Sequence, residues 1–405
     1  MIRERFLDLI YILVTCSLAL SFGGCRSHGR GVLADAGPVP ETVVHLKEFG
    51  LPTDYSHFDD DDCTSHVIGY RFVVWLPRDL VVVGFNTSPS CRANRDGRVS
   101  GGSVRIIAFD TKGNLKAQRD ISYDADGGDE IVAPGEAGQG PGGTLLFRVE
   151  EAGGSKSGVL LLDDRLNDVT RIDRFLERTD FFTHALSFQD GFTWNGPRTY
   201  DLLEGKQAGK TREVTREWPS GTMDREVGTY GDAYMSCKQE LKPGQWSDTN
   251  IVYGGAHRRC TLNVIGVNGK AWSTSLRDDQ VAEIVGVRSD GSAVGIVRAP
   301  KAADRLVVWQ PSGAATSLPW FPSGYETKLS GADSVMDRYL GKGESCESDC
   351  ERGSTRWMIF DAYEQNALVD RTSRNNSPMA LSMDGLHYAS FEAGELRIYS
   401  LAGRR

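Results

Sequence analysis

Short apolar runs recur along almost the whole chain, and each run ends at a turn signal. Runs of this length predict β-strands, and no segment has the apolar period of an amphipathic helix longer than about two turns. One unit, an apolar strand followed by a turn and a strand of alternating polarity, recurs seven times. The apolar strands of the seven copies are at residues 104–110, 159–163, 198–203, 262–267, 306–309, 357–361 and 396–401.

The spacing of these copies predicts the architecture. They are separated by about 49 residues on average, which is the period of four-stranded β-propeller blades. Three Asp-Gly pairs, beginning at Asp190, Asp290 and Asp384, interrupt strand-like runs. Since Asp-Gly adopts the positive φ angles of a tight hairpin, we expect these pairs to join the inner two strands of three blades. The predicted fold class is an all-β, seven-bladed β-propeller, with six or eight blades as alternatives.

The two ends of the chain indicate how such a ring closes. The seventh copy is followed only by residues 402–405, so the last blade lacks a fourth strand. A strand-like run at 42–49 precedes the first blade, and we expect it to supply that strand, because a ring must pair its first and last blades or leave an open edge. The competing architecture is a pair of β-sandwiches. It would need a linker near the middle of the chain, where none is evident.

Strand runs with this ring period resemble the WD-repeat-like propellers of bacterial envelope proteins. The resemblance covers residues 42–405, although no Trp-Asp dipeptide closes any blade. It implies a rigid disc whose N-terminal strand completes the last blade.

The first 25 residues have the plan of a secretory signal peptide. Arg3 and Arg5 precede an apolar run at 9–22, which is shorter than the roughly 20 residues that span a bilayer. Two glycines and Cys25 follow the run. This sequence resembles the lipobox of bacterial lipoproteins, with Phe22 where that family usually has leucine. The resemblance implies that a lipid on Cys25 anchors the protein to a membrane of the cell envelope, such as the outer membrane. The alternative is a plain signal peptide and a periplasmic or secreted protein.

Composition and charge limit the classes of partner. Of the 405 residues, 40% are hydrophobic and 25% are charged, as is ordinary for a soluble globular protein. The formal net charge is -9, with no basic stripe to neutralise phosphates, so nucleic acid is excluded as a partner. We expect residues 26–41 to be a flexible tether between the signal peptide of residues 1–25 and a propeller of residues 42–405.

The cysteines agree with export. Six remain when Cys16 and Cys25 are set aside, and they fall along the chain as three local pairs. An even number in an exported chain indicates disulfides. The predicted disulfides are Cys63–Cys91, Cys237–Cys260 and Cys346–Cys350. The alternative is a metal cluster, since His57 and His66 flank Cys63, but no CxxC pair accompanies these histidines.

The sharpest local charge is a run of four acids, Asp59, Asp60, Asp61 and Asp62. Oxygen ligands on a loop bind Ca²⁺, but a calcium loop spaces its acids so that they converge, and a solvated loop is therefore favoured over a metal site. Glycines at 138, 140 and 143 match the spelling of a dinucleotide fingerprint, yet a predicted strand follows them where a helix is required. No cofactor is expected.

Three long insertions between predicted strands are the candidate binding loops, because extra residues in a ring protein gather on its faces and carry binding. They span residues 86–102, 238–250 and 341–354. The candidate binding residues are Arg92, Arg95, Arg98, Trp246, Glu347 and Asp349.

Local catalytic signatures are missing: the sequence has no Gly-x-Ser-x-Gly elbow and no His-Glu-x-x-His pair. This favours a non-enzymatic binding or scaffold protein of the cell envelope that engages a protein or a polysaccharide through loops on one face. The alternative is an exported hydrolase or lyase with its site in the central funnel, because propeller enzymes draw catalytic residues from several blades.

Overall fold

The structure is a computed structural model in which residues 40–405 form one compact unit. The predicted signal peptide and most of the predicted tether, residues 1–37, lie outside the described residues. Within the described segments there is no helix long and apolar enough to serve as a membrane span. The described residues are 38–52, 71–87, 102–123, 137–150, 157–174, 176–179, 182, 184–193, 196–204, 211–219, 222–239, 258–276, 281–298, 303–322, 325–333, 335–345, 355–373 and 377–401.

Seven four-stranded antiparallel sheets make up this unit, and we number them as blades 1 to 7. Blade 1 contains β2 (Arg71–Leu76), β3 (Leu80–Asn86), β4 (Gly102–Asp110) and β5 (Leu115–Tyr123). Blade 2 contains β6 (Ala137–Gln139), β7 (Leu145–Glu150), β8 (Ser157–Leu162) and β9 (Asp168–Ile172), with the 3-10 helix η3 (Pro141–Gly143) between β6 and β7. Blade 3 contains β10 (Leu176–Thr179), β11 (Leu186–Thr193), β12 (Gly196–Glu204) and β13 (Thr211–Glu217).

The remaining blades follow in chain order. Blade 4 contains β14 (Thr222–Gly228), β15 (Gly231–Gln239), β16 (Arg258–Gly266) and β17 (Ala271–Ser275). Blade 5 contains β18 (Val281–Val287), β19 (Ala293–Arg298), β20 (Arg305–Trp309) and β21 (Ala315–Pro319). Blade 6 contains β22 (Tyr325–Asp333), β23 (Arg338–Ser345), β24 (Thr355–Asp361) and β25 (Asn366–Ser373). Blade 7 contains β26 (Met379–Leu381), β27 (His387–Glu392), β28 (Glu395–Ser400) and β1 (Thr42–His45).

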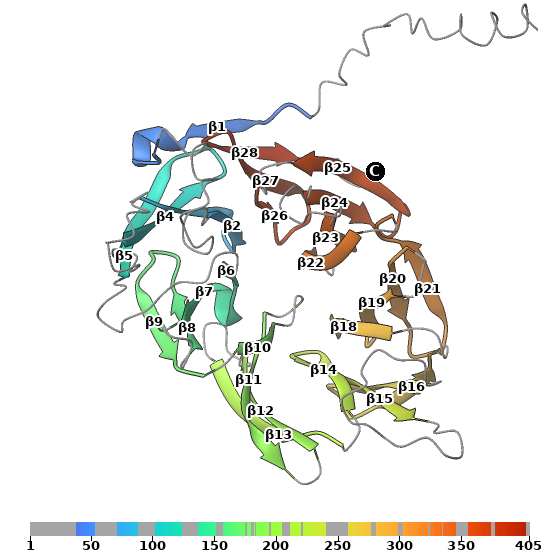
Figure 1. Ribbon diagram of the computed structural model, residues 1–405. Helices are drawn as coiled ribbons and strands as arrows, with labels where there is room; N and C mark the ends of the chain where they lie inside the picture. The colour runs from blue at the N-terminus through green and yellow to red at the C-terminus, as the bar shows by residue number, and fades with distance from the viewer. Residues whose placement is uncertain are drawn as a thin grey trace, which may run out of the picture. The chain divides into compact units, whose positions relative to one another are not determined.

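The blades are arranged around a central axis as a seven-bladed β-propeller, with the first strand of each blade innermost (Figure 1). Each of the seven predicted apolar strands lies on the third strand of a blade. That strand has a partner on both edges and a neighbouring blade against both faces, so it is largely buried on both sides. In β4, for example, Ile106, Ile107, Ala108 and Phe109 are all fully buried. The prediction of seven blades is confirmed, and the alternatives of six and eight are wrong.

Ring closure by the N-terminal strand is also confirmed. β1 pairs antiparallel with β28, with Val44 opposite Leu396. The strand is shorter than the predicted 42–49, because the chain turns into the 3-10 helix η1 (Leu46–Phe49) after His45. Gly50, at φ 90°, follows η1 and reverses the chain. Leu46 is fully buried in the core shared by blades 7 and 1, so the apolar residue that suggested a longer strand packs from a helical turn instead.

Two of the three Asp-Gly pairs lie in the predicted hairpins. The pairs at Asp290 and Asp384 lie between the first and second strands of blades 5 and 7. The prediction for Asp190 is wrong, because Asp190 and Gly191 lie inside β11, where the pairing with β12 shifts register. Gly191, at φ 154°, supplies the positive φ angle for a β-bulge rather than for a turn.

The core consists of apolar clusters between adjacent blades. Close packing of blades 5 and 6 requires Gly341, where an added Cβ would lie 2.3 Å from the Trp320 ring. Between blades 3 and 4 the apolar cluster is small, and polar groups accompany it. There the fully buried Asp201 accepts a hydrogen bond from Ser187 Oγ at 2.9 Å and pairs with Arg216 at 3.4 Å. Burial raises the pKa of the Asp201 carboxyl despite these contacts.

Candidate functional site

Most residues proposed from the sequence as site residues lie outside the described residues, so their roles stay predictions. The residues concerned are Cys25, Asp59, Asp60, Asp61, Asp62, Cys63, Cys91, Arg92, Arg95, Arg98, Trp246, Cys346, Glu347, Asp349 and Cys350. Among the described residues, no group of three or more histidine, cysteine, aspartate or glutamate side chains is placed to hold a metal ion.

One predicted disulfide lies within the described residues, and it is confirmed. Cys237 and Cys260 are directly opposite in the pairing of β15 with β16, and their Cα atoms are 4.0 Å apart. The bond joins the two strands next to the predicted binding segment that begins at residue 238. Disulfides of this kind are typical of proteins that fold in oxidising compartments.

Replacing Cys237 and Cys260 together by serine is expected to lower the free energy of unfolding by about 2 kcal/mol. The value is at the lower end of the usual range because the bond joins residues that strand pairing already places side by side. Urea denaturation of the wild-type and double-variant proteins under non-reducing conditions measures the difference. Dithiothreitol should destabilise the wild type more than the variant, because the two other predicted disulfides are common to both proteins, and an equal effect on both would contradict the assignment.

Strand order separates the propeller into two faces. In each blade the chain turns between strands one and two on one side, which we call the hairpin face; in blades 1 to 6 it turns again between strands three and four on the same side. In blade 5 these turns are 288–292 and 310–314. Strands two and three are joined on the opposite side, which we call the loop face; in blade 7 this joint is Ala393 and Gly394.

The strands that border all three predicted binding segments end on the loop face. The first segment lies between β3 and β4, and the second lies between β15 and β16. The third lies between β23 and β24, but it begins later than predicted, because residues 341–345 belong to β23. Each of these strand pairs consists of a second and a third strand. Three insertions that are far apart in the sequence are therefore attached to the same side of the ring.

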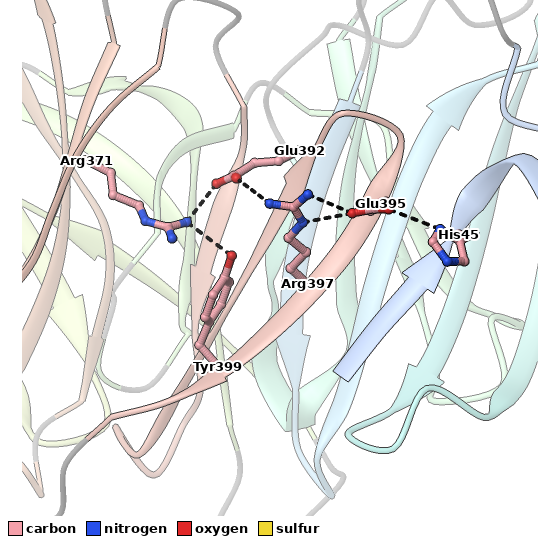
Figure 2. Close-up of polar contacts among 6 residues, drawn as sticks. All are labelled: His45, Arg371, Glu392, Glu395, Arg397 and Tyr399. Atoms are coloured by element: carbon pink, nitrogen blue, oxygen red, sulfur yellow. Dashed lines mark hydrogen bonds and ion pairs between the residues drawn. The ribbon is translucent and has the colours of Figure 1, made fainter. Parts of the chain in front are cut away.

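The loop face also carries a chain of alternating charges where blades 6 and 7 meet (Figure 2). Arg371 Nη1 lies 2.9 Å from Glu392 Oε1, and Arg397 Nη1 lies 3.5 Å from the other oxygen of Glu392. Arg397 Nη2 lies 2.7 Å from Glu395, and Glu395 Oε1 lies 3.1 Å from Nδ1 of His45. The chain of charges links β25, β28 and the N-terminal strand, so it fixes the closing blade on the side where the insertions are attached.

Two stacked tyrosines lie beneath this chain of charges. The Tyr388 and Tyr399 rings are parallel to within 5°, with centroids 4.6 Å apart. The Arg371 guanidinium lies 4.8 Å from the Tyr399 ring centroid and donates a hydrogen bond to Tyr399 Oη at 3.3 Å. The Tyr388 hydroxyl is buried and has no hydrogen-bond partner among the described residues. Burial raises the pKa of Tyr388 to about 12, and the nearby Arg371 cation only partly opposes this.

These properties predict a pH dependence that depends on Tyr388. An unfolded tyrosine ionises near pH 10. Since the pKa of folded Tyr388 is about 12, its contribution to stability is complete below pH 10 and is lost as the pH rises toward 12. Urea midpoints measured at pH 9, 10 and 11 should fall less steeply for Tyr388→Phe than for the wild type. At pH 7 the two proteins should be equally stable, because the hydroxyl loses no hydrogen bond to any of the described residues. An unchanged slope would contradict the prediction.

On the hairpin face, one contact joins two blades that are not adjacent in the ring. Phe182, in the segment between β10 and β11 of blade 3, lies edge-on to Tyr339 of blade 6, with centroids 6.4 Å apart. His184 follows, and burial lowers its pKa to about 4, so it is neutral at pH 7. The neutral, half-buried histidine and the two packed aromatic rings form a contact between blades 3 and 6.

A cavity of about 450 Å³ opens on the hairpin face of blades 1 to 3. Its inner wall includes the apolar residues Leu161 and Leu202, and the ion pair of Arg78 and Asp164, 2.7 Å long, lies at its edge. The glycine-rich segment 141–143 lines one side. Because that segment is η3, a short turn between two strands, the prediction that it is a loop and not a nucleotide-binding helix start is confirmed.

No protein-family model and no curated protein matches this sequence. Among solved structures, the chain is similar to the β-propeller domain of the Trilobed protease from Pyrococcus furiosus, with a TM-score of 0.44 and 11% identity over 83% of this chain and 94% of that chain. An uncharacterised protein of Listeria monocytogenes EGD-e gives a TM-score of 0.40 and 11% identity over 84% and 96% of the two chains. TolB from Acinetobacter baumannii gives 0.31 and 11% over 73% and 80%. The seven-bladed assignment follows from the sheet topology of this chain itself.

Proposed function

We propose that this protein is an exported, lipid-anchored β-propeller of the cell envelope that binds or scaffolds a protein or polysaccharide partner through its loop face. The observation that carries the proposal is the common side of the ring on which the three insertions are attached. A rigid sheet that positions variable loops is a frequent arrangement for binding sites. The Cys237–Cys260 disulfide supports the proposal, because it links the strands at the base of one insertion.

The signal-peptide pattern and the disulfide support export. A lipid on Cys25 would anchor the chain through residues 26–41, which reach the ring at Thr42. In the antiparallel pairing, Thr42 is opposite Ile398, while His45 at the other end of β1 lies next to the loop face. The chain that precedes the ring therefore joins β1 at its hairpin-face end. Export without lipidation would give a periplasmic or secreted protein with the same loop face.

The lipid anchor is tested by metabolic labelling with an alkyne fatty acid in the native host. The wild-type protein should incorporate the label and fractionate with membranes, and Cys25→Ser should lose both properties. A labelled Cys25→Ser protein, or an unlabelled wild type, would leave the plain signal peptide as the explanation.

The partner is sought by crosslinking the tagged native protein in its own envelope fraction, followed by affinity capture and mass spectrometry. We expect one stoichiometric partner, lost when Arg92, Arg95 and Trp246 are replaced together by alanine. The matched control replaces Arg78, Arg165 and Val267 by alanine, since all three are exposed on the hairpin face. An equal loss with both variants, or no partner above background, would argue against binding through the loop face. Glycan and lactone substrates would then be assayed.

A further inference from the structure

On the hairpin face, neighbouring turns of blades 5, 6 and 7 form one continuous surface. Arg288 in blade 5 pairs with Asp337 in blade 6 at 3.1 Å. The backbone N–H of Ala362 donates to the Asp337 carbonyl at 2.9 Å, which ties the two hairpin-face turns of blade 6 together. Arg338 Nη1 donates to the Gly385 carbonyl at 2.5 Å, which joins blade 6 to blade 7. The turns are therefore held in fixed positions relative to one another.

Three large apolar side chains are exposed on this surface. Val335 is 81% exposed, Tyr363 is 70% exposed and Met383 is 43% exposed. Val335 and Tyr363 each follow an aspartate by two positions, and Met383 directly precedes Asp384. The carboxylate of each of these aspartates accepts backbone N–H groups of its turn. Asp333 accepts from Val335 N at 3.1 Å, and Asp361 accepts from Tyr363 N at 3.0 Å. The turns are thus fixed by their own hydrogen bonds. Met383 Sδ also accepts a hydrogen bond from Gln139 Nε2 at 3.0 Å, and the large exposed fractions of Val335 and Tyr363 are typical of an interaction site.

Acidic groups surround the three apolar side chains. The four turns that form the surface, together with the strand residues that flank them, contain six acids but only two arginines and one histidine. Arg338 is 2% exposed and Arg288 is half-buried, and both are paired with aspartates. Glu364, Asp290 and Asp384 are exposed, and His387 lies 3.8 Å from Asp384. The surface therefore presents apolar anchors within a negative field.

We propose that this turn patch, made of Val335, Tyr363 and Met383 with Asp290, Glu364 and Asp384, is a second docking surface that binds a cationic, amphipathic segment of a partner protein. An apolar side chain of the segment would pack between the three anchors, and flanking lysines or arginines would face the acids. Charge disfavours two other occupants. An anionic lipid surface and a second copy of the same patch would both be repelled by the acids. The patch lies opposite the loop face, so the inference does not depend on the function proposed above.

Fluorescence anisotropy of labelled peptides on the full chain tests the proposal. The probes are three 14-residue peptides: an amphipathic leucine–lysine helix, its leucine–glutamate counterpart and a lysine–serine peptide without apolar residues. We expect the leucine–lysine peptide to bind most tightly. Its Kd should rise about tenfold with the Val335→Ser/Tyr363→Ser double variant and several-fold with Glu364→Lys or on raising the salt from about 50 to 500 mM.

Val267→Ser is the matched control, because Val267 is 78% exposed on the hairpin face of blade 4, away from the patch. This variant should bind the leucine–lysine peptide as the wild type does. All substituted side chains are exposed, so loss of folding does not confuse the result, and circular dichroism verifies this. Equal binding of the leucine–glutamate peptide, no binding of any peptide, or equal weakening by Val267→Ser would overturn the proposal. So would a concentration-dependent dimer, by analytical ultracentrifugation, that Val335→Asp abolishes.

Discussion

Replacing Arg338 by alanine is expected to lower the free energy of unfolding by about 4 kcal/mol. Arg338 is 2% exposed and lies directly opposite the fully buried Asp361 in the pairing of β23 with β24. Its Nε is 3.1 Å from Asp361 Oδ2. Without the guanidinium, the carboxylate remains buried and uncompensated, and the link to the Gly385 carbonyl of blade 7 is also lost. Urea denaturation followed by tryptophan fluorescence measures the change.

An exposed ion pair provides the control for this prediction. Arg78 and Asp164 are closer, at 2.7 Å, but the Arg78 side chain is 81% exposed. Arg78→Ala should therefore cost about 0.5 kcal/mol or less. The double variant Arg338→Met/Asp361→Asn should lower the free energy of unfolding by less than the sum of its single variants. Each single substitution leaves one buried charge without its partner, whereas the double variant leaves no buried charge. Additive costs would mean that the buried pair is not coupled.

Replacing Leu46 by alanine is expected to cost about 3 kcal/mol and to loosen the closure of the ring. Leu46 is fully buried between blades 7 and 1, and its backbone N–H donates to the Gly394 carbonyl at 3.0 Å. Because β1 contains only four residues, this one side chain supplies much of the apolar contact that keeps β1 on β28. Truncation leaves a cavity next to a short strand.

Hydrogen exchange distinguishes loosened closure from a general loss of stability. In Leu46→Ala, amides of β28 that pair with β1 should exchange faster, whereas amides of β7 in blade 2 should change only with global stability. The control is Val43→Ala, because Val43 is 42% exposed on the same strand and should cost well under about 1 kcal/mol. If β28 and β7 respond equally, β1 does not open separately from the rest of the ring.

Part of the candidate site could be predicted from sequence, and part could not. Spacing along the chain identified the Cys237–Cys260 pair, because the two cysteines lie on consecutive paired strands. Spacing also identified long insertions, but not the side of the ring on which they are attached, since that depends on which strands of each blade they join. The charge chain of Figure 2 was missed altogether. It joins His45 to Arg371 and Arg397, and single charged residues on polar strands carry no sequence signal for a partner more than 300 positions away.

The sequence by itself predicted seven blades, with six or eight as alternatives, because the third strand of each blade is largely buried and leaves a strand-like run that recurs about every 49 residues on average. It also determined that an N-terminal run closes the ring, since an unpaired edge strand is costly. Only the tertiary structure decided where that strand ends, at His45 instead of residue 49, and that Asp190 belongs to a bulge and not to a hairpin. Those features depend on contacts with other blades: Leu46 turns inward to fill the core between blades 7 and 1, and the pairing of β11 with β12 absorbs the extra residue. Local residue preferences cannot specify contacts made by distant parts of the chain.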